Sequence, residues 1–320
     1  WDTLPPGGRF ALVLALVTGL HLLGAASTPG FPGLAVALHA VGSVALGAGI
    51  FLVGQIFHLQ THWPAGVLLW LIGAGLGWLL LRQWPQLALV AVLGPIWLIS
   101  EWFWLCEQVL PPPLRHDWGI SLIPTAGVLL LCVVYLGAPR REVTDAPRRV
   151  LMWLGGLGLI PAAAAWIARI PAHPSAGIAP WSPPQLLSLS GWALAMGGPL
   201  LLGSWLRGRQ MWPMAVAAAW ILASIALERP NSPLGYAWSG LAGILLVAWG
   251  VHESRSERIN LGTALVGLTV IAFYFGEVMS KLERSLSLVL LGVLCLGGGW
   301  ALERLRRRML ARLSRSEPGS

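Results

Sequence analysis

About eleven apolar spans follow one another along this chain of 320 residues, with short connections between them. Each is close to the roughly 20 apolar residues that a helix needs to cross about 30 Å of hydrocarbon. The sequence therefore predicts an all-α fold, a polytopic bundle of transmembrane helices. The spans are expected at residues 10–27, 33–56, 65–81, 86–106, 119–137, 150–168, 186–206, 211–227, 234–252, 259–279 and 286–303.

The composition agrees with a bilayer rather than water as the solvent. The chain is 56% hydrophobic and 11% charged, whereas soluble domains have roughly 25% charged residues. Its net charge of +8 arises from basic residues between the spans and in a short tail, which is typical of topology signals and argues against a nucleic-acid partner. We expect one transmembrane domain over residues 1–308, followed by a basic cytoplasmic tail at 309–320. The domain could consist of two halves, at 1–138 and 149–308.

The basic residues also predict an orientation, because cytoplasmic loops carry an excess of Arg and Lys. With the C-terminus inside, the inner segments hold 15 of them: Arg82, Arg140, Arg141, Arg148, Arg149, Arg207, Arg209, Arg255, Arg258, Arg304, Arg306, Arg307, Arg308, Arg312 and Arg315. The outer segments hold six: Arg9, Arg115, Arg169, Arg229, Lys281 and Arg284. We therefore expect a bacterial inner-membrane protein with a cytoplasmic C-terminus.

An odd number of spans places the two ends on opposite sides, so Trp1 is expected on the outer, periplasmic side. The chain opens with Trp1-Asp2-Thr3-Leu4-Pro5-Pro6, which has neither an initiator Met nor the features of a signal peptide. A preceding helix, giving about twelve spans in all, is the simplest account. A cleaved signal peptide is the alternative.

Several motifs bear on helix starts and packing. Trp63-Pro64, Trp84-Pro85 and Trp212-Pro213 each suit a first helical turn at the lipid–water boundary. The stretch Gly73-Ala74-Gly75-Leu76-Gly77 offers a face of small residues that lets helices approach closely.

The chain lacks the common catalytic motifs, among them the Walker A loop, GxGxxG, HExxH, GxSxG and CxxC. No catalytic residue and no cofactor is therefore assigned. His58 and His62 have the i, i+4 spacing that could hold a metal, but Trp63-Pro64 puts His62 in a connection, so no metal site is expected. His21 and His39 are interpreted as hydrogen-bonded packing residues rather than haem ligands.

Polar residues within the spans are the remaining candidates for function, since a charge at the centre of a span costs roughly 2.5–3.5 kcal/mol. In the expected topology most of them lie near the outer face. They would form an outward-facing polar vestibule that binds a ligand, although residues near span ends also reach water without any partner. The predicted site residues are Gln55, His58, Glu101, Arg169, Tyr274 and Glu277.

Two stretches carry a family resemblance: Trp1-Asp2 with Pro5-Pro6, and Gln55-Ile56-Phe57-His58 followed by Leu69-Trp70. They resemble a bacterial family of predicted integral membrane proteins of unknown function, the DUF-2157 type, over about the first 80 residues. That family often has an acidic residue shortly after the histidine, where this chain has Gln60, Thr61 and His62. The resemblance implies a multispan fold and a preceding helix, and it implies no activity.

The leading functional hypothesis is a transporter-like or lipid-handling protein, in which Glu101 and Glu277 bind a cation or proton, His58 tunes that charge and Gln55 orients the ligand. A non-catalytic scaffold or sensor subunit of an envelope complex is the second hypothesis. A membrane-embedded transferase acting on lipid-linked substrates is the third. The expected partners are membrane lipids and, for the second hypothesis, other membrane subunits.

Overall fold

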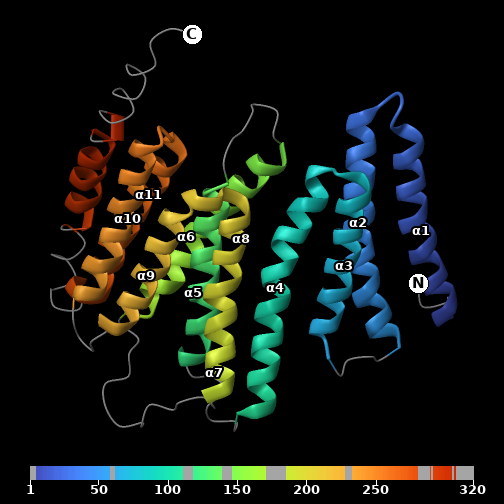
Figure 1. The fold of residues 1–320 in the computed structure, drawn as a ribbon, viewed down its shortest axis with the longest axis horizontal. Coiled ribbons are helices and arrows are strands. Elements are labelled where there is room, and N and C mark those ends of the chain that lie inside the picture. The colour runs from blue at the N-terminus through green and yellow to red at the C-terminus, as the bar shows by residue number, and fades with distance from the viewer. Residues whose placement is uncertain are drawn as a thin grey trace. The chain divides into compact units, whose positions relative to one another are not determined.

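The computed structural model describes residues 5–57, 62–110, 118–138, 146–170, 185–227, 233–279, 289, 291–304 and 306–307. These residues contain helices and no strand (Figure 1). The first six helices are α1 (Pro6–Ser27), α2 (Pro32–Ile56), α3 (Pro64–Leu81), α4 (Trp84–Val109), α5 (Trp118–Leu136) and α6 (Ala146–Ala168). They are followed by α7 (Gln185–Trp192), α8 (Gly198–Arg207), α9 (Trp212–Leu227), α10 (Leu234–His252) and α11 (Ser256–Phe273).

Short segments of other helix types interrupt or extend these helices. A π-helix, η2 (Ala193–Gly197), joins α7 to α8 within a single span, and a 3₁₀ turn, η3 (Gly208–Gln210), follows α8. A second π-helix, η4 (Tyr274–Val278), continues α11, and a third, η6 (Leu294–Gly298), lies near the C-terminus. Widened turns of this kind occur frequently at functional sites.

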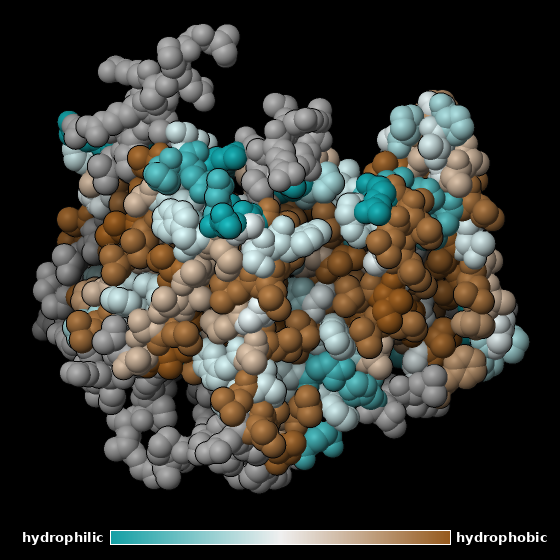
Figure 2. Space-filling model, in the orientation of Figure 1, coloured by the Kyte–Doolittle hydropathy of each residue, from teal (hydrophilic) through white to brown (hydrophobic). Residues whose placement is uncertain are grey.

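The predicted all-α transmembrane fold is confirmed. Eight helices of the described part are long and apolar enough to cross a membrane, and two shorter apolar helices lie at Ser121–Leu136 and Trp212–Ala226. These ten match the first ten predicted spans closely, whereas the span expected at 286–303 begins outside the described residues. In Figure 2, apolar residues cover the middle of the helices and hydrophilic residues gather toward their ends, as expected of a chain in lipid.

The chain divides into two compact units. Unit 1 comprises Trp1–Ile120 with Arg140–Leu154, and unit 2 comprises Ser121–Pro139 with Gly155–Ser320. Unit 1 therefore holds α1 to α4, and unit 2 holds most of α5, most of α6 and all of α7 to α11. The single domain expected over residues 1–308 stays a prediction.

Histidines and glycines interlock α1 and α2 in unit 1. The His21 and His39 Nδ1 atoms lie 3.0 Å apart, so one ring donates a hydrogen bond to the other. Each ring packs against a glycine of the opposite helix: a Cβ on Gly42 would come within 2.9 Å of His21, and one on Gly24 within 2.9 Å of His39. These contacts support the interpretation of both histidines as hydrogen-bonded packing residues.

A buried amide links the next helices of unit 1. The Gln86 side chain is fully buried, its Oε1 accepts a hydrogen bond from the Ser43 hydroxyl, and its Nε2 donates to the His39 carbonyl. Trp70 of α3 also donates to the Ser43 carbonyl. Gln86 follows Trp84-Pro85 at the start of α4, where the predicted Trp-Pro helix opening is confirmed. The amide thus satisfies its polar atoms where water is absent.

Glycines also let α10 and α11 of unit 2 approach backbone to backbone. A Cβ on Gly262 would come within 2.7 Å of the Gly243 carbonyl oxygen and 2.8 Å of the Val247 nitrogen, both on α10. Small residues at helix contacts are the usual route to close packing in membranes, because the hydrophobic effect does not drive one helix onto another there. In Figure 1 these two helices run side by side.

We therefore expect Gly262→Ala to destabilise the protein by about 1–3 kcal/mol, since the new methyl group meets backbone atoms that have no room to shift. The midpoint of thermal unfolding in detergent, followed by tryptophan fluorescence, measures the effect. Gly240→Ala is the matched control on α10, because its Cβ would lie 3.9 Å from the nearest atom, on Thr269. Equal midpoints for the two variants would contradict close backbone packing at Gly262.

Candidate functional site

Two arginines and one glutamate form a polar cluster at one end of unit 2. Arg207, the last residue of α8, donates from Nη2 to Glu253 Oε1 at 2.9 Å, and Arg258 of α11 donates from Nη1 to Glu253 Oε2 at 2.7 Å. Arg258 also donates to the carbonyl of Leu136 at the end of α5. Trp249 of α10 donates its indole N–H to Glu253 Oε1 at 2.7 Å. The cluster therefore ties together the ends of four helices.

The α10–α11 turn places Glu253 and Arg258 for these contacts. Glu253 is the residue that ends α10, and Ser254 after it has a left-handed backbone with φ of 53°. The Arg255 N–H then donates back to the Gly250 carbonyl at 2.7 Å. A side chain at Gly250 would collide with the Ile259 nitrogen and the Arg255 carbonyl oxygen. The turn is thus tight enough for α11 to begin directly against α10.

Trp249 forms the boundary between this cluster and the helix interior. The Arg258 guanidinium carbon lies 3.7 Å from the centre of the Trp249 ring, and that of Arg207 lies 5.9 Å from it. Cations over an indole face are attracted by its negative π-face, more strongly when both are desolvated. The ring therefore shields two buried guanidinium groups from the apolar region beyond it.

The electrostatics of the cluster favour the ionised carboxylate. Burial alone would raise the pKa of Glu253, but the hydrogen bonds from Arg258, Trp249 and Arg207 outweigh it and lower that pKa to about 2. Glu253 lies just past the end of the α10 span. Because its pKa is lowered, the carboxylate is anionic at neutral pH.

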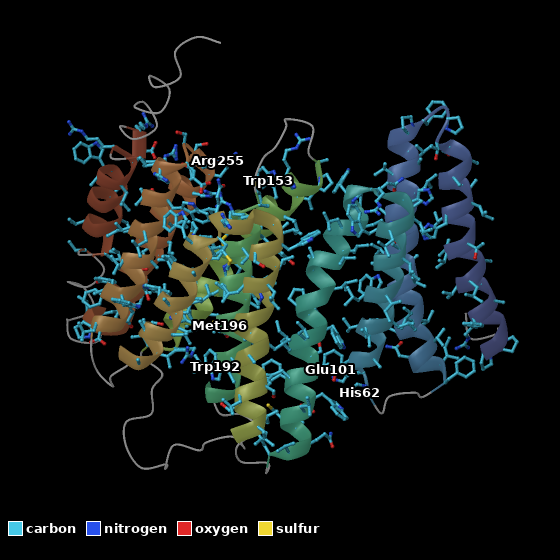
Figure 3. All side chains as sticks on the ribbon, in the orientation of Figure 1. His62, Glu101, Trp153, Trp192, Met196 and Arg255 are labelled. Atoms are coloured by element: carbon cyan, nitrogen blue, oxygen red, sulfur yellow. The ribbon has the colours of Figure 1, made fainter. Side chains whose placement is uncertain are left out.

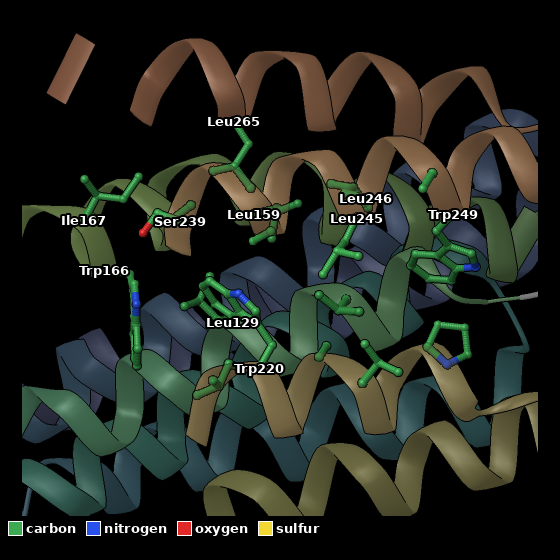
Figure 4. A pocket seen from close by; sticks show the side chains of 18 of the residues that line it. Leu129, Leu159, Trp166, Ile167, Trp220, Ser239, Leu245, Leu246, Trp249 and Leu265 are labelled. Atoms are coloured by element: carbon green, nitrogen blue, oxygen red, sulfur yellow. The ribbon is translucent and has the colours of Figure 1, made fainter. Parts of the chain in front are cut away.

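On the other side of Trp249 lies an apolar cavity of about 350 Å³ within unit 2 (Figure 4). Trp166 and Ile167 of α6 lie toward one end of it, and Trp249 of α10 lies toward the other. His252, three residues after Trp249 on α10, also lines the cavity. Most of the remaining lining residues are aliphatic and come from α5, α6, α9, α10 and α11, among them Leu129, Leu159, Val216, Ala217, Leu245 and Leu265. The cavity can hold an apolar molecule of modest size, since small-molecule pockets typically measure about 300–1,000 Å³.

Three predicted site residues lie outside the cavity lining, Arg169 directly after α6 and Tyr274 and Glu277 on η4, which continues α11. The Arg169 side chain is buried, with its guanidinium carbon 4.9 Å from the centre of the Trp166 ring. Tyr274 is 1% exposed, and the half-buried Glu277 follows it on the π-helix η4. Glu277 interacts electrostatically with Tyr236, whose ring packs edge-on against Phe273. The structure thus gathers Tyr236, Tyr274 and Glu277 where α10 begins and α11 ends.

The start of α10 also lies close to Arg169 in space. Ile170, which follows Arg169, packs against Gly235, because a Cβ on that glycine would lie 3.1 Å from the Ile170 side chain. Gly235 in turn precedes Tyr236. The three predicted residues of unit 2 therefore share one end of that unit.

The predicted site residues of unit 1 are Gln55, His58 and Glu101, and the structure shows a partner for Glu101. Glu101 on α4 is paired: its Oε2 lies 3.1 Å from His62 Nε2, and its Oε1 accepts a hydrogen bond from the Trp97 indole (Figure 3). The His62 ring also packs edge-on against Trp104. Gln55 is exposed near the end of α2, and His58 lies outside the described residues. A shared vestibule of all six predicted residues stays a prediction.

Two features escaped the sequence analysis. The arginines at 207 and 258 look like ordinary topology signals, and only the fold brings them onto one carboxylate. His62 stands in a connection with no acidic residue beside it, and its partner lies 39 positions later on another helix. One signal in the sequence could have pointed to Glu253 and Glu101: carboxylates are rare in this chain, which has only 13 acidic residues.

Comparison with known families supports the membrane assignment. Residues 1–87 match the model of a family described as "Predicted membrane protein (DUF2157)", which confirms the resemblance over the start of the chain. That match covers α1, α2, α3 and the first residues of α4, and therefore excludes the cavity of unit 2. No curated protein and no solved structure matches the chain.

We expect Glu253→Gln to lower stability by about 3 kcal/mol at neutral pH, because it leaves two buried guanidinium groups without their anion. Since folding lowers the pKa of Glu253 from 4.5 to about 2, the carboxylate stabilises the fold fully above about pH 5. This contribution disappears as the pH falls through 2. Thermal midpoints measured from pH 7 downward should therefore converge for wild type and variant.

Glu107→Gln supplies the control, since Glu107 is an exposed carboxyl on α4. Its midpoint should follow that of the wild type at every pH. A constant gap between wild type and Glu253→Gln down to pH 2 would rule out a role for the charge.

Proposed function

We propose that this multi-pass membrane protein binds an amphipathic ligand of lipid type, with the ligand's apolar chain in the cavity of unit 2. The observation that carries the proposal is the cavity itself, a space of about 350 Å³ whose lining is almost wholly apolar and comes from five helices. The methylene groups of an acyl chain suit this lining, because they make dispersion contacts with its aliphatic side chains and carry no polar group that would lose hydrogen bonds there.

The lining favours a chain-like apolar ligand over a polar solute. Its polar groups are few, and the Ser239 hydroxyl among them already donates to the Gly235 carbonyl. A sugar, nucleotide or amino acid would lose its hydration there and find few hydrogen-bond partners in return. The proposal is thus the lipid-handling form of the leading hypothesis from the sequence.

Orientation is part of the proposal. We place the protein in a bacterial inner membrane with its C-terminus cytoplasmic, supported by the excess of basic residues in the segments assigned to the inside. The contacts of Arg207 with Glu253 and of Arg258 with Leu136 support it further, because these residues come from three segments assigned to the same side.

The proposal is tested by filling the cavity. Ala217→Phe on α9 places a ring into the lining, and we expect roughly tenfold weaker binding of the ligand, since overpacking costs about 1–3 kcal/mol. The probe is stearic acid with a mid-chain nitroxide, and the measurement is its motionally restricted fraction by electron paramagnetic resonance in detergent.

Ala219→Phe is the control, because Ala219 is exposed on the same helix and lies outside the cavity lining. It should leave the restricted fraction unchanged. If wild type restricts no probe, or if Ala217→Phe and Ala219→Phe behave alike, the cavity is not a ligand site.

A second candidate function, a proton-coupled carrier, is favoured by the His62–Glu101 pair in unit 1. An imidazole hydrogen-bonded to a carboxylate can share and release one proton, and intramembrane chains of such groups serve as proton relays. The indole of Trp97 fixes the orientation of the carboxylate through its other oxygen.

Proteoliposomes with an imposed pH gradient test this candidate. Dissipation of the gradient, followed with an entrapped pH-sensitive dye, should fall severalfold in Glu101→Gln and stay at the wild-type rate in Glu107→Gln. Equal rates for Glu101→Gln and wild type would exclude a coupling role for the pair.

A further inference from the structure

We infer that the arginine cluster at the Trp249 end of the cavity binds the phosphate of an anionic lipid, so that the ligand proposed above is an anionic phospholipid. This inference rests on the proposed function and specifies the class of ligand. It starts from a charge imbalance: among the residues that the structure describes, Arg207 and Arg258 both pair with the same carboxylate, that of Glu253.

The imbalance coincides with unused hydrogen-bonding capacity. The Arg207 side chain is only 7% exposed, and its buried Nε and Nη1 atoms have no hydrogen-bond acceptor within the described part of the chain. Arg258 differs, since it donates to both Glu253 and the Leu136 carbonyl. Buried donors without acceptors are rare and costly in proteins. Arg207 therefore carries the excess charge and the free donors of the cluster.

A phosphate meets both needs, since it is anionic and its oxygens accept charge-assisted hydrogen bonds from a guanidinium fork. Arg207 lies close to the protein surface, since it is the last residue of α8 and the three residues of η3 that follow are exposed. A long arginine side chain at such a position can extend toward a headgroup.

The cavity next to the cluster indicates why the anion belongs to a lipid. Trp249 contacts the arginines of the cluster and also lines the cavity, as does His252 on the same helix. An acyl chain gains little by leaving lipid for an equally apolar cavity. Selectivity must then come from the polar end of the ligand, where Arg207 lies.

The test compares lipids that differ in the headgroup alone. In native mass spectrometry of the full chain from detergent, phosphatidylglycerol should be retained roughly tenfold more than phosphatidylcholine with the same acyl chains, as expected of one charge-assisted hydrogen bond. Arg207→Gln should abolish this preference. Arg209→Gln, which removes an exposed arginine from the adjoining turn, should leave it intact.

Glu253→Gln extends the test in the opposite direction. It releases both arginines from their carboxylate, so the preference for phosphatidylglycerol should increase, and this lipid should raise the thermal midpoint of the variant more than that of wild type. This result remains available if Arg207→Gln does not fold.

The outcomes separate the two proposals. Equal retention of both lipids by wild type, an unchanged preference in Arg207→Gln, or equal stabilisation by inorganic phosphate would overturn the assignment of an anionic lipid. The proposed function survives those results if Ala217→Phe still lowers retention of both lipids. It fails if Ala217→Phe changes neither, whatever the headgroup preference.

Discussion

The absence of water inside a bilayer is the constraint on which the rest of this structure depends. A polar group there must find its partner within the protein, so the backbone forms helices and each buried polar side chain requires a specific neighbour. Gln86 shows the rule most clearly: it is fully buried, accepts a hydrogen bond from Ser43 and donates one to the backbone of α2. The same demand pairs His21 with His39, and His62 with Glu101.

The helices could be predicted because hydrophobicity alone determines where a span lies. Ten predicted spans coincide with described helices to within a few residues, and Trp-Pro marks the start of α4 and α9 as expected. The boundaries of the two units could not be predicted. Ser121–Pro139 belongs to unit 2, which is otherwise formed by residues after Leu154, and this depends on how the helices pack. Helix packing in lipid is set by shape, as at Gly243 and Gly262, and shape leaves little trace in hydropathy.

The candidate site was predicted less well than the fold, for a physical reason. Sequence reasoning ranks polar residues by depth, and depth selected Glu101, Arg169 and Glu277 as candidates. It does not show which residues meet. Arg207 and Arg258 lie near span ends, where a positive charge is ordinary, yet their side chains are buried on one carboxylate. The cavity could not be predicted from the sequence, because the apolar residue types that line it are the same types that form a fully packed interior.

These features together argue that binding in unit 2 separates two tasks. Between Trp166 and Trp249 the lining is almost wholly apolar, so it accepts a chain by shape and distinguishes little else. In the proposed complex, Arg207 next to Trp249 would supply what the apolar lining lacks, a charge that distinguishes one headgroup from another. Because Trp249 contacts both regions and also donates to Glu253, a ligand that displaces its ring also disturbs the carboxylate that balances the arginines. If a ligand binds as proposed, occupancy of the cavity and the hydrogen bonding of Glu253 are therefore expected to be coupled through this one side chain.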